Sequence, residues 1–462
     1  MSRPNILLIT DDQHRYDFFE GGAVPGLQAP ALARLAQEGT TLTNAFSSCP
    51  LCVPTRFTWW YGLRASQGNG AWGDTDEEWP ANLRSMPQVL RENGYCTAVI
   101  GKIHSHSGLH ELDLTAHRDG IVARGFDHVL ETAGKTMAQW HDCDYTKFLA
   151  ERGHLDAYRR RLRELGGHHA EPLPFPEEEA MDAFIGRHAC EWLRTYDKDK
   201  PFFLHASYCD PHFPFNPPKS YADRYRPEDM PIPAGMDDPE AIRRHQLVCA
   251  RYCALIEHCD HQIGRLLSVL DDRGWAKDTV VIFSTDHGDM MGDRGCYGKS
   301  RPYDTSARTP VIVRYPRAVP AGSALHDPAE SIDLPCAILD AAGFAGEPQE
   351  HLPASPGRSW WRYVTQQSDH HRRYAYSEMG TWKMVADREW KFIHRDGDED
   401  ELYDRVADPG EQQNLAAAVE HQERIIRMQK WMIDSLGQNI APPSMPRHEV
   451  ATEPADSEAP AR

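Results

Sequence analysis

The sequence predicts an α/β fold in which a large, mixed but mostly parallel sheet carries helices on both faces. Short runs that are apolar on both sides recur along the chain, which suits buried parallel strands. Helical patterns lie between these runs, and alternating strands and helices form a sheet that is covered on both faces. Polar residues follow several runs directly, where ligands bind in such folds.

Five apolar runs predict the strands of this sheet: residues 5–10, 97–100, 202–208, 279–284 and 311–314. Helical patterns at 29–39 and 86–94 each end in a glycine, which is typical of a helix C-cap. The longest pattern, 241–274, has apolar residues spaced along one helix face. Residues 105–200 are polar, and we expect loops and helices there that cover the active-site face and govern substrate selectivity.

The character of the sequence changes near residue 370, so we expect a catalytic domain over 1–369 and a small α+β subdomain over 370–440. Residues 441–462 are rich in Pro, Ala, Ser and Glu, which predicts a disordered tail or one that wraps a neighbouring subunit of a homo-oligomer. Two short strands and one helix are predicted within the subdomain: 382–385, 390–394 and 416–436.

Composition limits the partners of the protein. The net charge of −19 disfavours non-specific binding to nucleic acid or to an acidic membrane, so an anionic substrate needs a local basic pocket. Eleven irregularly spaced cysteines do not resemble a secreted disulfide framework. The first strand leaves no room for a signal peptide, and no apolar run reaches the ~18 residues of a membrane span. We therefore expect a cytoplasmic protein with no nucleic-acid or membrane partner.

The segment Cys49 to Arg56 places a thiol, Cys52, ahead of a proline and an arginine. Proline suits the first turn of a helix, so Cys52 can face the unpaired N–H groups and positive dipole end of that helix. Arg56, one turn on, adds a permanent cation, which suits a nucleophile that meets an anion. Cys49 and Cys52 also form a Cys-x-x-Cys pair, so a redox dithiol or half of a zinc site stays open.

Two polar clusters follow predicted strands far apart in the chain. Asp11, Asp12 and Gln13 follow the first strand, and Asp286 and His287 follow the strand at 279–284. Carboxylate and amide oxygens together with an imidazole can hold a divalent cation. If the two strand ends meet, these clusters form a metal site.

Basic residues follow two other strands and one loop. Lys102 and His104 come after the second predicted strand, and His212 comes after the third. Lys299 lies in a glycine-rich loop, which can approach a metal with little steric cost. We expect these side chains to share one pocket.

Several motifs resemble, in the same order, those of sulfatases of the alkaline-phosphatase-like superfamily. They are Cys-x-Pro-x-Arg at 52–56, Gly-x-Arg at 62–64, Gly-Lys-x-His at 101–104, Pro-His-x-Pro at 211–214 and Gly-Lys at 298–299. The resemblance implies an alkaline-phosphatase-like fold and a sulfuric ester hydrolase acting on small-molecule or glycan sulfate esters. It also implies that a formylglycine-generating enzyme oxidises Cys52 to formylglycine, whose hydrate is the nucleophile.

The same resemblance implies the metal ligands. They would be Asp12, Gln13, Cys52, Asp286 and His287, and Asp286 would also accept a proton from the hydrate. Ca²⁺ is expected as in most sulfatases, with Mn²⁺ as the alternative because imidazole nitrogen suits it better. Whether Asp11 binds the metal as well is left open.

Roles for the remaining motif residues also follow from the resemblance. Arg56 would stabilise the nucleophile, while Lys102 and Lys299 would neutralise charge on the transferred group. His212 or Lys299 would protonate the departing alcohol, and His104 would deprotonate residue 52 so that sulfate is released. The substrate would contact Lys102, His212 and Lys299.

Two other functions are compatible with parts of the pattern. The Asp12-Gln13 and Asp286-His287 pairs are also similar to those of phosphonate monoester hydrolases, so a phosphonate monoester or phosphodiester hydrolase is the alternative. A catalytically silent binding protein of the same fold is disfavoured, because every motif position keeps a side chain that can react.

Overall fold

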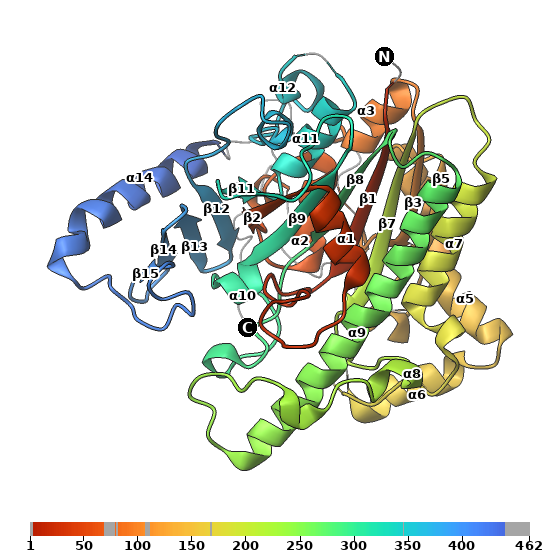
Figure 1. The fold of residues 1–462 in the computed structure, drawn as a ribbon, viewed down its shortest axis with the longest axis horizontal. Coiled ribbons are helices and arrows are strands. Elements are labelled where there is room, and N and C mark those ends of the chain that lie inside the picture. The colour runs from red at the N-terminus through yellow and green to blue at the C-terminus, as the bar shows by residue number, and fades with distance from the viewer. Residues whose placement is uncertain are drawn as a thin grey trace, which may run out of the picture.

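A computed structural model describes residues 3–68, 79, 82–106, 111–166, 169–344 and 346–438. Within these ranges a nine-stranded sheet runs through the molecule in the order β10-β2-β9-β8-β1-β7-β3-β5, with β11 also paired to β2 (Figure 1). Its strands are β1 (Asn5–Asp12), β2 (Thr40–Phe46), β3 (Cys96–Lys102), β5 (His128–Thr132), β7 (Phe202–Pro211), β8 (Thr279–Thr285), β9 (Arg308–Arg314), β10 (Ser323–Leu325) and β11 (Ala329–Glu330).

β1 lies near the middle of this sheet, parallel to both neighbours, with Ile6 opposite Phe203 of β7 and Val280 of β8. Its side chains are buried on both faces, which explains the continuous apolar run. Leu7 and Ile9 pack into one core and Ile6 and Leu8 into the other. The predicted α/β fold with helices on both faces is confirmed.

Helices cover both faces of the sheet. The core that contains Leu7 lies beneath α1 (Pro30–Glu38), α7 (Met181–Thr195) and α9 (Pro239–Asp272). The opposite core lies beneath α2 (Cys52–Tyr61), α3 (Met86–Glu92) and α11 (Asp333–Ala341). The other α-helices that precede residue 370 are α4 (Arg118–Ala123), α5 (Asp144–Glu151), α6 (Leu155–Leu165), α8 (Lys219–Ala222), α10 (Asp304–Ala307), α12 (Pro348–His351) and α13 (Trp361–Val364).

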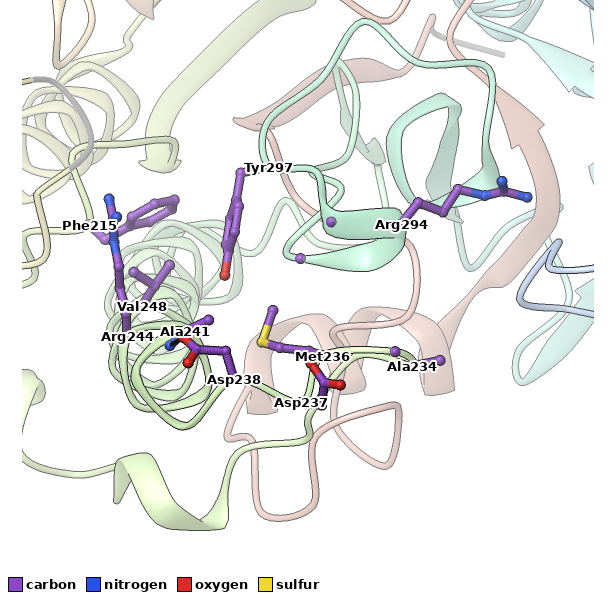
Figure 2. A pocket seen from close by; sticks show the side chains of 13 residues that line it. Phe215, Ala234, Met236, Asp237, Asp238, Ala241, Arg244, Val248, Arg294 and Tyr297 are labelled. Carbon is purple, nitrogen blue, oxygen red and sulfur yellow. Dashed lines mark hydrogen bonds between the residues drawn. The ribbon is translucent and has the colours of Figure 1, made fainter.

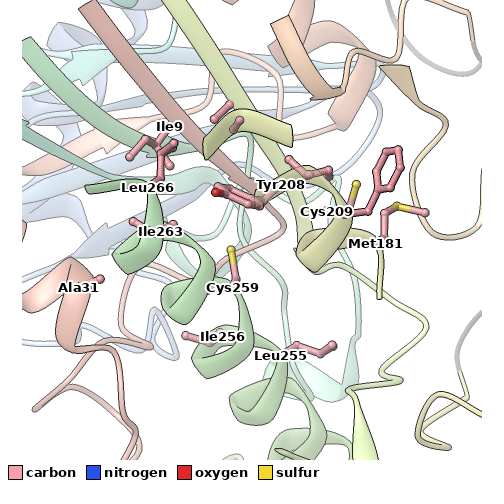
Figure 3. Close-up of a cluster of buried hydrophobic side chains, with 14 of the residues drawn as sticks. Ile9, Ala31, Met181, Tyr208, Cys209, Leu255, Ile256, Cys259, Ile263 and Leu266 are labelled. Carbon is pink, nitrogen blue, oxygen red and sulfur yellow. The ribbon is translucent and has the colours of Figure 1, made fainter. Parts of the chain in front are cut away.

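The longest helix, α9, begins at a strong capping signal. The carboxylate of Asp238 accepts the backbone N–H of Ala241 at 2.8 Å, and Pro239 occupies the first turn. Its buried face carries Ile263 and Leu266 toward Ile9 of β1 (Figure 3). The one-face spacing in the sequence therefore marks the contact with the sheet.

A smaller unit follows the main sheet and lies to one side of it (blue in Figure 1). Its antiparallel sheet contains β12 (Ala375–Met379), β13 (Trp382–Ala386), β14 (Trp390–Arg395) and β15 (Glu401–Asp404). The helix α14 (Gln422–Gln438) packs on it through Met428 and Trp431. The small C-terminal α+β unit is thus confirmed. Its predicted boundary at 369/370 stays a prediction, and the tail 441–462 lies outside the described residues.

Several element predictions need correction. The predicted helix at 416–436 starts later, at Gln422, after a short 3₁₀ turn. Two further strands, β12 and β15, complete the small sheet. In the main sheet β9 begins at Arg308 and runs antiparallel to both β8 and β2. Gly39 is not a left-handed cap: its backbone is extended, and a Cβ there would collide with the carbonyl of Val313.

The region 105–200 contains strands in addition to the predicted loops and helices. It contributes β5 to the main sheet, the short strands β4 (Leu112–Asp113) and β6 (His141–Asp142), and the buried helix α7. Most of the polar residues of α7 lie on its outer face, while its apolar residues pack against β7 and α9. Among the described residues, none of the helices combines the length and apolarity that a membrane crossing requires.

Candidate active site

The predicted functional residues meet at one edge of the main sheet. Asp12 ends β1, Lys102 ends β3, His212 follows β7 and Asp286 follows β8. These four strands are adjacent and parallel, so their carboxyl ends lie side by side. Segments distant in sequence therefore build a single pocket.

Cys52 is the first residue of α2 and is buried. The backbone N–H of Thr55 donates to the Leu51 carbonyl at 3.1 Å, which closes the first helical turn. The hydroxyl of Thr55 donates to the Cys49 carbonyl at 2.8 Å and lies 2.7 Å from the hydroxyl of Ser47. Thr55 thus fixes the loop that presents Cys52.

Four buried residues offer donor atoms at a common point. One atom each from Asp12, Cys52, Asp286 and His287 lies within 4.8 Å of all the others. Two carboxylates and an imidazole in such a cluster fit a divalent cation. Asp11 is not one of these four residues, and its Oδ2 lies 2.6 Å from Nδ1 of His14.

Arg56 joins the ends of several strands. Its guanidinium donates to Oδ2 of Asp286 at 3.1 Å and to Oδ2 of Asp12 at 3.0 Å. It also donates to the Lys102 carbonyl and to the Ser207 hydroxyl, both at 2.8 Å. A guanidinium presents its donors in a fixed plane, so Arg56 sets the spacing of the two carboxylates.

Basic side chains surround the thiol. Lys299 Nζ lies 2.9 Å from Cys52 Sγ and 2.8 Å from His212 Nε2. Lys102 Nζ donates to Asp12 Oδ2 at 2.6 Å. His104 also contributes to lowering the pKa of the Cys52 thiol. The structure therefore brings the predicted basic residues Arg56, Lys102, His104, His212 and Lys299 together around Cys52.

The close approach of Lys102 depends on the residue before it. Gly101 has φ = +120°, a backbone conformation that L side chains rarely adopt, and a Cβ there would collide with the carbonyl of Ser207. Glycine at the end of β3 therefore lets the chain turn Lys102 into the pocket.

The charges of this pocket shift the pKa values of its acids. Burial would raise the pKa of Cys52, but Lys102, Lys299 and His287 bring it well below its usual range. Burial and the neighbouring Asp12 raise the pKa of Asp286 to about 6. The pocket thus favours an anion at residue 52 and disfavours a second negative charge on Asp286.

The pKa of the His212 imidazole is lowered, in contrast to that of Asp286. Burial and the positive charge of Lys299 lower the pKa of His212 to about 3. His212 is therefore neutral near pH 7, and its Nε2 can accept a hydrogen bond from Lys299 Nζ.

Asp289 is a residue of the site to which the sequence analysis gave no role. Its buried carboxylate accepts the backbone N–H of Met291 at 2.7 Å and that of Gly298 at 2.9 Å. It also accepts a hydrogen bond from Nε2 of Gln13. The amide oxygen of Gln13 consequently faces the pocket, where it accepts Lys299 Nζ at 3.1 Å. The sequence signal that could have identified Asp289 is its position two residues after His287.

The C-terminal unit supports the same loops. The indole N–H of Trp382 donates to the Ser300 carbonyl at 3.2 Å, and the Ser300 N–H donates to the Pro50 carbonyl at 3.0 Å. The backbone N–H of Glu378 donates to the carbonyl of Ser48 at 3.0 Å. No local pattern marked these contacts, because they form only when the two sheets pack together.

Comparison with known proteins agrees with this geometry. A family model described as sulfatase matches residues 4–344, and one described as N-sulphoglucosamine sulphohydrolase, C-terminal, matches residues 292–438. An arylsulfatase of Clostridium perfringens is 28% identical over 94% of each chain. A choline-sulfatase of Rhizobium meliloti is 29% identical over 90% of this chain and 82% of its own.

Solved structures share the fold. The crystal structure of a phosphonate monoester hydrolase of Agrobacterium radiobacter has a TM-score of 0.78 at 22% identity, covering 95% of this chain and 96% of that chain. At this identity the likeness concerns the fold alone.

Proposed function

This chain belongs to the sulfatase family, and from that membership we propose that it hydrolyses sulfate esters with a nucleophile made from Cys52 beside a divalent cation. Its relatives identify it as a sulfuric ester hydrolase. The observation that carries the proposed mechanism is the buried cluster of Asp12, Cys52, Asp286 and His287 with two lysines next to it.

The nucleophile would be formylglycine, formed when a formylglycine-generating enzyme oxidises the Cys52 thiol. Two features support this assignment over a redox dithiol. Cys52 faces the lysines and the donor cluster, which have no function in dithiol exchange. Burial, together with nearby Glu378, raises the pKa of Cys49 well above its usual range, so Cys49 is a poor partner thiolate.

The cation would be held by Asp12, Gln13, Asp286 and His287, together with the side chain at position 52. When bound, such an ion stabilises negative charge on the oxygens of an ester and on a nearby hydroxyl. Ca²⁺ fits the carboxylate and amide oxygens, and Mn²⁺ is the alternative because His287 offers nitrogen.

The basic side chains would orient the ester and move protons. Lys102 and Lys299 would bind the sulfate oxygens, and removing one such donor commonly lowers kcat by ~100–1,000-fold. The pair formed by Lys299 and His212 would deliver a proton to the departing alcohol oxygen. His104, which helps to lower the pKa of Cys52, would accept a proton from residue 52 so that sulfate can leave. Arg56 would hold the carboxylates in place throughout.

The phosphonate monoester alternative is not favoured. The curated relatives named above are sulfatases, whereas the phosphonate monoester hydrolase resembles this chain in fold. The direct test compares kcat/KM for 4-nitrophenyl sulfate with that for 4-nitrophenyl phenylphosphonate, using protein matured with a formylglycine-generating enzyme. A higher value for the sulfate is expected, and a clear preference for the phosphonate would refute the proposal.

The role of Cys52 is tested by substitution. A Cys52→Ala variant removes the atom that must be oxidised, so turnover of 4-nitrophenyl sulfate should fall to background while the fold persists. Wild-type turnover by this variant would contradict the mechanism. Circular dichroism of both proteins controls for misfolding.

A further inference from the structure

A cavity of about 660 Å³ lies between three segments near the active site. They are the chain after His212, the segment leading into the first turns of α9, and the glycine-rich loop before Lys299. Figure 2 shows Phe215, Tyr297 and Met236 around one space, while the side chain of Arg294 points away from them.

The cavity adjoins the Lys299–His212 side of the pocket. The ring of Phe215, in the cavity wall, is 6.4 Å from the ring of Phe213 between centroids, and Lys299 Nζ is 5.4 Å from the latter centroid. The same Nζ lies 2.9 Å from Cys52 Sγ. Tyr297, another wall residue, precedes Lys299 by two positions. The cavity wall is therefore connected to Lys299 through the ring of Phe213.

Most polar groups of the wall already have partners. The Asp238 carboxylate caps α9, and the Tyr297 hydroxyl hydrogen-bonds to His245 Nδ1 at 3.0 Å. The guanidinium of Arg294 donates to the Tyr403 hydroxyl at 2.8 Å. Within the described ranges, Asp237 and Arg244 have no such hydrogen bond, and both are exposed at the rim.

The surfaces that remain for a ligand are mainly apolar. They include the rings of Phe215 and Tyr297 and the side chains of Met236 and Val248. Burying an aromatic ring against such side chains is favourable. A sugar would instead bury hydroxyl groups with few partners, which opposes binding. The volume lies within the range of small-molecule sites, roughly 300–1,000 Å³.

We propose that this cavity binds the alcohol part of the sulfate ester and selects an aryl or similarly flat, apolar alcohol over a sugar. The proposal rests on the proposed function, because it requires the ester to react at residue 52. Phe215, Met236 and Tyr297 would then determine specificity without taking part in the chemistry.

The test fills the cavity from its helical wall. An Ala241→Trp variant places an indole in the cavity, and Arg243→Trp, on the same helix but outside the wall, is the matched control. We expect Ala241→Trp to lower kcat/KM for 2-naphthyl sulfate at least about tenfold, as steric changes in apolar pockets do. Its kcat/KM for ethyl sulfate, which is too short to fill the cavity, should change much less, and Arg243→Trp should resemble wild type.

A second pair of variants separates the ring from the hydroxyl. Tyr297→Ala should raise KM for 2-naphthyl sulfate, and Tyr297→Phe should raise it less because it keeps the ring. The non-hydrolysable 2-naphthalenesulfonate should bind the wild type more tightly than methanesulfonate in calorimetry. Ala241→Trp should remove this difference.

Three results would overturn the proposal. They are an unchanged kcat/KM for 2-naphthyl sulfate in Ala241→Trp, equal losses for both esters, and a wild type that prefers glucosamine 6-sulfate to 2-naphthyl sulfate. If the matured wild type hydrolyses none of these esters, the proposed function itself fails. Calorimetry with the two sulfonates needs no turnover, so it still decides whether the cavity binds an aryl group.

Discussion

Asp289→Asn is the substitution whose effect can be worked out most fully from the structure. The native carboxylate accepts two backbone N–H groups and Nε2 of Gln13. An asparagine has one oxygen, which would stay with the backbone donors of Met291 and Gly298. Its NH₂ group would then face the NH₂ group of Gln13. The Gln13 amide should rotate, which turns its Oε1 toward residue 289 and its Nε2 toward the pocket.

This rotation should weaken the binding of the cation, because an NH₂ group would then face the pocket in place of the amide oxygen. Hydrogen bonds to a charged group contribute about 1.5–3 kcal/mol each, and substitutions that misorient a metal ligand weaken metal affinity by about 10–100-fold. We therefore expect the Kd for Ca²⁺ to rise by about 10–100-fold. Titration of the metal-free protein against a calcium-buffering chelator measures this Kd without relying on turnover.

A second substitution makes the test specific. Adding Gln13→Glu to Asp289→Asn places an oxygen on each side of residue 13. One carboxylate oxygen can then accept an N–H from the new amide at position 289, while the other faces the pocket. We expect the double variant to recover much of the lost affinity. An unchanged Kd in Asp289→Asn alone would refute the reasoning, because it would mean that the orientation of Gln13 does not matter for the cation.

Three further predictions concern the supports of the site. Trp382→Phe keeps an aromatic ring but loses the hydrogen bond to the Ser300 carbonyl. Because this bond contributes ~1 kcal/mol, steady-state kinetics should show kcat/KM for 4-nitrophenyl sulfate reduced by less than about tenfold. An unchanged kcat/KM would show that this contact does not position Lys299. Thr55→Val removes a buried hydroxyl with two partners and should lower the free energy of unfolding by about 1–3 kcal/mol in urea titrations, whereas Thr55→Ser keeps the hydroxyl and should lower it less. Burial opposes ionisation of Asp333, but Arg372 brings its pKa well below the usual range. Its stabilising effect is therefore complete above about pH 4 and is lost as pH falls further, so urea midpoints should drop less between pH 5 and pH 3 in Asp333→Asn than in wild type.

The sequence predicted the central strands and the site because both have local signals. β1 is apolar on both faces, and its polar residues begin where the strand ends, at Asp11 and Asp12. The strands toward the two ends of the sheet, β2 and β5, were harder to predict. β2 contains three threonines and Asn44 among its seven residues, and the five-residue β5 begins with an exposed histidine, so neither strand has a continuous apolar run. Their pairing with β9 and β3 decides their conformation.

The same distinction applies within the site. Cys52, Lys102 and Lys299 lie in motifs whose residue types and order identify them. Asp289 and Trp382 act through hydrogen bonds to other loops, and those contacts depend on how the glycine-rich loop and the small sheet pack. Such roles appear only when the donor and acceptor atoms are placed in three dimensions.

The most direct test of the central claim is the mass of the peptide that contains residue 52, taken from purified, active protein. The proposed mechanism predicts a peptide whose mass shows an aldehyde in place of the thiol, in a fraction that rises in proportion to kcat when a formylglycine-generating enzyme is co-expressed. Full activity in protein whose residue 52 is entirely an unmodified cysteine would contradict it.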